Sequence, residues 1–181
     1  MVKLTEKPAS KPAPRSRASS VVGAIAGPAR PVLIEVFAND TPEGVAFTHV
    51  WKFEDIPGDP MKPGTIDLPH GKTAYRLRFR LNDNTRPSKQ LKFKNPCTNA
   101  MYVAVGGPCP PPAGNGGGQI QFNYPWTPYL LTVDDMNHGN PVLLKYALRF
   151  DGEPGHEASN PLKLCPPYEY DPDLKNGGGN N

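Results

Sequence analysis

Short runs of alternating apolar and polar residues recur along most of this chain. In Tyr75–Leu81, the odd positions are apolar and the even positions are all arginine. A repeat of two puts the apolar side chains on one face of a β-strand, whereas a helix would scatter the arginines around its circumference. Val142–Phe150 alternates in the same way. Both segments therefore predict strands with one face in the core and the other in solvent.

Further segments predict strands because β-branched and aromatic residues gather in them between turn residues. They are Val32–Phe37, Val45–Ile56, Leu91–Lys94, Met101–Val105, Gln119–Tyr124 and Tyr129–Val133. The 24 Pro and 18 Gly fall between these runs and show no collagen-like period, so they punctuate loops. We predict an all-β fold: an antiparallel two-sheet β-sandwich of about eight strands, with a β-barrel as the alternative.

The two ends of the chain differ in composition from the part between them. Residues 1–30 are rich in Lys, Pro, Ala and Ser and have little apolar surface to bury, which predicts a disordered basic arm. Residues 31–170 carry the strand patterns and form the predicted sandwich domain. Residues 171–181 are rich in Gly and Asn, and we expect a flexible tail there.

The net charge of +3 indicates no particular partner, but the basic residues are concentrated in places. Arg76, Arg78 and Arg80 share one face of a strand, and Lys92 and Lys94 could extend the row on a paired strand. Such a stripe suits a polyanion, because arginine binds two oxygens of a phosphate or sulfate at once. The aromatic residues of these strands point the other way, which argues against nucleic acid. The alternative is an outer face in contact with solvent.

An aromatic loop is the second candidate site. Tyr124, Trp126 and Tyr129 lie beside two prolines that fix the backbone. A rigid group of rings is typical of a carbohydrate-binding module, because sugar faces stack on it at low entropic cost. The alternative is that these rings cap the core.

An acidic turn is the third candidate. Asp134, Asp135 and Asn137 offer the oxygen ligands that calcium prefers, and calcium bound there could assist carbohydrate recognition. The spaced pattern of an EF-hand loop is absent, and Asp and Asn also favour ordinary turns. No other cofactor is indicated.

Sequence signatures of catalysis are missing: there is no G-x-S-x-G elbow, phosphate loop or dinucleotide fingerprint. We therefore expect a soluble, non-catalytic protein that binds another protein or a second copy of itself, with carbohydrate or a polyanion as alternatives. Cys97, Cys109 and Cys165 form no C-x-x-C pair, so the sequence leaves open whether they are reduced or disulfide-bonded. A cytoplasmic location is the default. Export through the weak signal-like segment Ser19–Ala26 is the alternative.

Overall fold

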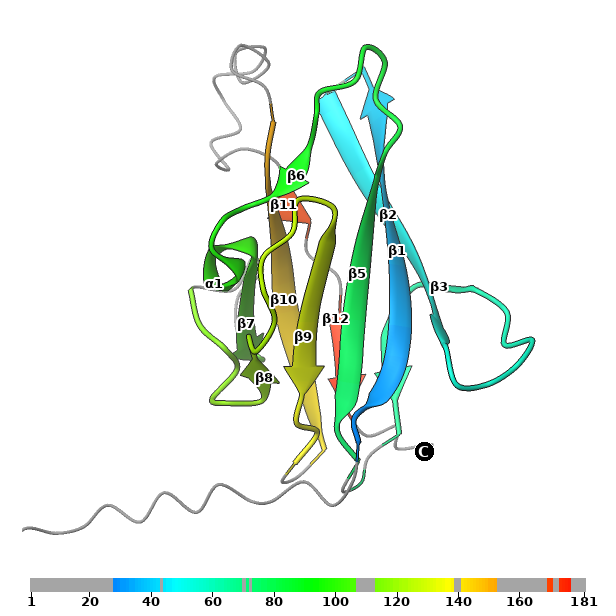
Figure 1. Ribbon diagram of the computed structural model, residues 1–181, viewed down its shortest axis with the longest axis vertical. Helices are drawn as coiled ribbons and strands as arrows, with labels where there is room; N and C mark the ends of the chain where they lie inside the picture. Colours follow the sequence, from blue (N-terminus) through cyan, green and yellow to red (C-terminus); the bar gives the residue numbers. More distant parts are fainter. Residues whose placement is uncertain are drawn as a thin grey trace, which may run out of the picture.

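Two packed β-sheets and one single-turn helix make up the part of the chain that the computed structural model describes (Figure 1). These residues are 28–42, 44–69, 71, 73–106, 113–138 and 141–152, with the backbone of 169–170 and 173–176. The predicted all-β, two-sheet fold is thus confirmed. Within this part, no helix is long and apolar enough to cross a membrane.

The first sheet contains six strands in the order β3-β2-β1-β5-β9-β8. Their bounds are β1 Arg30–Thr41, β2 Gly44–Phe53, β3 Lys62–Pro63, β5 Tyr75–Asp83, β8 Ile120–Gln121 and β9 Leu130–Asp135. β1 and β5 run parallel, and the other neighbours in this sheet are antiparallel.

The second sheet is built around β10. Its strands are β4 Ile66–Leu68, β6 Lys92–Phe93, β7 Met101–Val105, β10 Val142–Asp151, β11 Glu169–Tyr170 and β12 Asp173–Asn176. β6 and β7 pair along one edge of β10, and the helix α1, Cys97–Ala100, lies between them in the chain. β11 and β12 pair along the other edge, and β4 adds to β12 in parallel.

The core lies between the sheets and is formed by the inward half of each alternating strand. In β1 and β5, residues such as Ile34, Leu77 and Phe79 have no exposed surface. Tyr146 of β10 meets Phe79 from the opposite sheet, with ring centroids 5.6 Å apart. This packing is the main stabilising contribution in a β-sandwich, because it removes apolar surface of both sheets from water.

Several elements differ from the sequence prediction. The predicted strand Gln119–Tyr124 is reduced to the two residues of β8, and Cys97–Ala100 forms a helical turn. β12 falls within 171–181, where we expected a flexible tail, and pairs with both β10 and β4. A four-residue strand is too short to show a repeat of two, so the composition of the tail dominated the prediction. Residues 1–27 of the predicted arm, Cys109 and Cys165 lie outside the described residues.

Candidate functional site

The candidate functional site lies on the outer face of the first sheet, where charged and apolar side chains from three strands lie next to one another. Strand register sets side chains from β2, β1 and β5 in rows across it. One row runs Lys52, Leu33, Arg78, and the next runs Val50, Glu35, Arg80. Neighbouring strands lie about 4.8 Å apart and alternate side chains about 7 Å apart, so these residues form a grid of close contacts.

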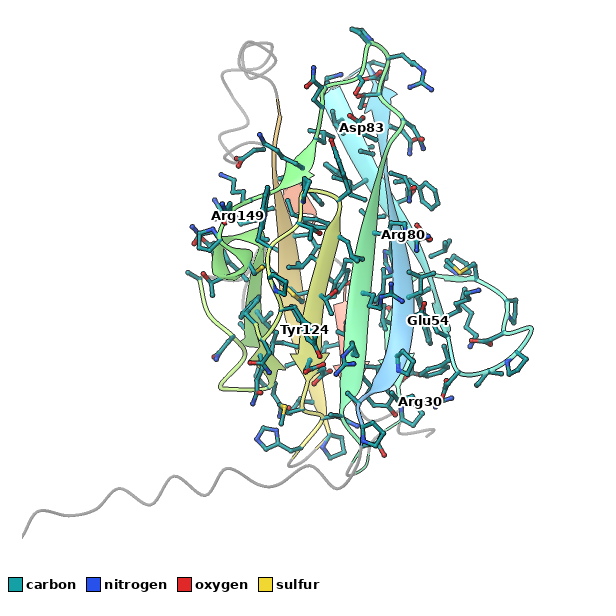
Figure 2. The ribbon with its side chains drawn as sticks, viewed as in Figure 1. Arg30, Glu54, Arg80, Asp83, Tyr124 and Arg149 are labelled. Carbon is teal, nitrogen blue, oxygen red and sulfur yellow. The ribbon has the colours of Figure 1, made fainter. Side chains whose placement is uncertain are left out.

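The arginine stripe of β5 is matched by carboxylates from neighbouring segments. Arg76 Nε donates to Asp134 of β9 at 3.2 Å, and Arg80 Nη1 donates to Glu35 of β1 at 2.9 Å. Figure 2 labels Arg80 along this part of the sheet. The paired carboxylates offset most of the positive charge that the sequence pattern presents, so this face offers a polyanion less attraction than the sequence alone suggests.

The third arginine of the stripe, Arg78, forms an ion pair that crosses an intervening strand. Arg78 Nη1 donates to both oxygens of Glu54, at 2.8 and 3.0 Å, although β1 lies between β5 and the end of β2. Leu33, on the β1 face crossed by this bridge, is only 7 % exposed. An outward-facing leucine is therefore sheltered by charged side chains, whose aliphatic stems cover apolar surface while their heads reach water.

A groove of about 510 Å³ opens on this face beside the bridge. Its lining combines four apolar residues with four polar or charged ones: Leu33, Phe37, Val50 and Met61, and Glu35, Lys52, Arg80 and Asn82. The volume falls within the range of small-molecule sites, but the groove is shallow and largely open to solvent, and its lining is about half apolar and half polar.

The charged residues of the groove are not equivalent. Glu35 accepts hydrogen bonds from Arg80 and, at 2.8 Å, from Asn82 Nδ2, so its charge is already compensated. Lys52, by contrast, makes no ion pair with any described residue. The groove therefore has one ammonium group whose charge no contacting carboxylate neutralises.

The basic residues predicted to extend the stripe lie elsewhere. β6 pairs with β10 in the second sheet and not with β5, so Lys92 and Lys94 do not continue the row of arginines. Lys94 is paired with Asp151 at 3.5 Å, and Lys92 is exposed. The extension of the stripe to these two lysines was wrong, because alternation within a strand does not reveal which strand is its neighbour.

The three rings of the aromatic loop do not share one open face. Trp126 packs against the core and its indole N–H donates to the Phe93 carbonyl at 3.0 Å. The Tyr124 hydroxyl hydrogen-bonds to Asp134, and Arg76 lies over its ring at 5.0 Å. Desolvation, followed by this hydrogen bond, raises the pKa of Tyr124. Only Tyr129, 55 % exposed, presents a largely open ring.

The acidic turn places its two carboxylates on opposite faces of β9. Asp134 faces outward and is paired with Arg76, whereas Asp135 is fully buried. Asp135 Oδ1 accepts the backbone N–H of Asn137 at 3.0 Å, and Asn137 Nδ2 donates to the Pro69 and Thr73 carbonyls. Asp135 and Asn137 thus lie together at the end of the sandwich, and Asp134 does not join them. No cluster of three or more His, Cys, Asp or Glu side chains suited to a metal occurs in the described residues.

Sequence reasoning missed the groove residues on β1 and β2. Val32, Leu33 and Ile34 form an unbroken apolar run, so the outward position of Leu33 breaks the alternation. Val50 likewise lies at an outward position of β2, between Thr48 and Lys52. An apolar residue at an outward strand position is a usable signal for a surface site. Locating the groove also required the pairing of β1 with both β2 and β5.

Comparison with known proteins adds no relative: no protein-family model matches the chain, and no curated protein is significantly similar to it in sequence.

Proposed function

We propose that this chain is a non-catalytic binding protein whose ligand occupies the groove on the outer face of the first sheet. The observation that carries the proposal is the groove itself, about 510 Å³ in volume and lined by equal numbers of apolar and polar residues. Seven of its eight lining residues lie on β1, β2 and β5, which are the long strands of the sheet, and Met61 lies just before β3. Rigid strands hold a binding surface more accurately than loops do.

We favour the groove over the two binding sites expected from sequence. A polyanion on the arginine stripe would compete with the carboxylate partners of Arg76, Arg78 and Arg80. A sugar on the aromatic loop would meet one open ring, because Trp126 packs on the core. Among the described residues, Lys52 forms no ion pair that a ligand would have to break.

Amide NMR spectra of the ¹⁵N-labelled protein, titrated with a fragment set of anionic, cationic and neutral small molecules, test this proposal. We expect fragments to shift amides of β1, β2 and β5 around the groove. Val50→Glu, which places a carboxylate on the apolar lining beside Lys52, should abolish the shifts that anionic and neutral fragments cause. Thr132→Glu, on β9 at the same outer face of the sheet but outside the groove lining, should not. If no fragment binds, or if every shift maps to another surface, the proposal is wrong.

Sedimentation velocity on the same samples identifies a second copy as the occupant. If a dimer forms and its formation shifts the groove amides, the groove is the binding face and its ligand is a second copy of this chain.

A further inference from the structure

The groove contains a cation, Lys52, that no carboxylate in the described part of the chain neutralises by contact. Lys52 lies in a row with Leu33 and, across β1, with Arg78. The Arg78 guanidinium is held by both oxygens of Glu54, but no described carboxylate contacts the Lys52 ammonium. An ammonium group among ion pairs and apolar side chains can form a charge-assisted hydrogen bond with an incoming anion.

The carboxylates near Lys52 are already occupied. Asp59 interacts with Lys52 at longer range, but its oxygens accept the Phe53 amide at 2.8 Å and bind the Lys62 ammonium at 3.1 Å. Glu35, the carboxylate of the groove lining, is held by Arg80 and Asn82. Each of these carboxylates is thus already partly neutralised by another cation or by amide donors, so it competes less strongly with an incoming anion for Lys52.

The groove also has an apolar part to receive a hydrophobic group. Val50, Phe37 and Met61 line the groove and are partly exposed, whereas Leu33 is buried and offers a ligand little surface. A ligand that covers the three partly exposed side chains removes apolar surface from water and is stabilised in proportion to that area. Lys52 and the apolar side chains line the same groove, so a ligand that uses both needs a negative charge and an apolar body in one molecule.

On this basis, and resting on the proposed function, we propose that the groove binds a small amphiphilic monocarboxylate, with its head on Lys52 and its hydrocarbon body over Val50, Phe37 and Met61. One uncompensated ammonium group matches one carboxylate, whereas a dianionic phosphate would bring more charge than the groove balances. Arg80 strengthens the polar end. Its contact with Glu35 uses Nη1, while a guanidinium has five N–H donors and the side chain is 50 % exposed.

Four ligands separate the contributions of charge and tail: decanoate, decanol, decyltrimethylammonium and acetate, each kept below its micellar concentration. We expect decanoate to shift the groove amides and to bind at least about tenfold more tightly than decanol or decyltrimethylammonium. Acetate should cause no measurable shift. Equal or tighter binding of decanol, or decanoate shifts outside the groove, would overturn the assignment. This comparison uses the unaltered chain, so it holds even if a variant fails to fold.

Substitutions of Lys52 then test its role. Lys52→Met keeps the aliphatic stem and should weaken decanoate binding about tenfold while leaving decanol unchanged. Lys52→Arg should restore decanoate binding, and Lys52→Glu should reverse the preference toward decyltrimethylammonium. Lys92→Met removes an exposed lysine of the second sheet and should have no effect. Unchanged decanoate affinity in Lys52→Met would refute the role of Lys52.

The two proposals fail in different ways. If neutral or cationic fragments occupy the groove as well as anions do, the ligand class is wrong and the binding face is retained. If nothing occupies the groove, both are wrong.

Discussion

Replacing Asp83 by alanine should lower the free energy of unfolding by about 2–4 kcal/mol, because this carboxylate organises the whole loop between β5 and β6. Asp83 Oδ1 accepts the backbone N–H of Thr85 at 3.0 Å and the Thr85 hydroxyl. Its Oδ2 accepts the Ser88 hydroxyl at 2.9 Å and the backbone N–H of Leu91 at 3.2 Å. Figure 2 places Asp83 where β5 enters this loop.

The expected magnitude follows from the two backbone donors. Thr85 and Leu91 have no exposed surface, so alanine at position 83 leaves their N–H groups buried without an acceptor. Each such group costs about 1–3 kcal/mol, whereas the hydroxyl of the exposed Ser88 can turn to water. Against a total stability of about 5–15 kcal/mol for an average domain, the loss is large enough to measure accurately.

Urea unfolding at pH 7, followed by circular dichroism, gives the measurement. Asp67→Ala is the matched control: Asp67 is an exposed aspartate in the middle of β4, and its removal should change stability by less than about 0.5 kcal/mol. A loss below about 1 kcal/mol in Asp83→Ala, or one no larger than that of Asp67→Ala, would refute the argument.

The same carboxylate predicts an acid sensitivity. Desolvation raises the pKa of Asp83, but the hydrogen bonds from Thr85, Ser88 and Leu91 outweigh it and hold the pKa below its usual value. The folded protein therefore binds this proton less readily than the unfolded chain does. The stabilisation is present above the usual aspartate pKa and is lost as the pH falls below it. Asp83→Asn should accordingly show a weaker loss of stability between pH 5 and pH 3.

Two further predictions concern His49 and Trp126. Burial lowers the pKa of His49 despite its hydrogen bond to the Gly64 carbonyl, so the unfolded chain takes up a proton first as the pH falls through about 6.5. Urea unfolding should show stability falling from pH 7.5 to pH 5.5, and equal falls in wild type and His49→Gln would contradict this cause. Trp126→Ala should cost about 2–3 kcal/mol, less than for a fully buried tryptophan, because the side chain packs on the core while remaining partly exposed. Tyr129→Ala is its exposed control, and a loss in Trp126→Ala no greater than in that control would exclude core capping.

The strands were predictable where a repeat of two extended over several residues. Tyr75–Leu81 lies within β5, and Val142–Phe150 within β10, with the expected inward residues buried. The predicted strand Met101–Val105 coincides with β7. Burial of one face imposes this repeat, so local sequence carries enough information to identify such strands.

The site was not predictable in the same way, because its chemistry depends on pairing between distant segments. The carboxylates that bind Arg76, Arg78 and Arg80 lie 58, 24 and 45 residues away in the sequence. The alternation within one strand predicts the row of arginines, but it does not predict the carboxylates that neutralise them, because these come from other segments. The uncompensated charge of Lys52 emerges only by comparison with these pairs.

The two sheets draw on different parts of the chain. Every strand of the first sheet is complete by Asp135, whereas the second sheet also requires β10, β11 and β12, which end at Asn176. At roughly 5–20 residues per second, a ribosome needs about 2–8 s to add the intervening residues. Until β10 is made, the second sheet lacks the strand to which β6 and β7 pair, and it stays incomplete until β12 is added, so the inward side chains of the first sheet, Ile34 and Phe79 among them, are not fully covered. Slow synthesis of residues 136–176 would therefore prolong the time in which the nascent protein exposes apolar surface to chaperones or to other chains.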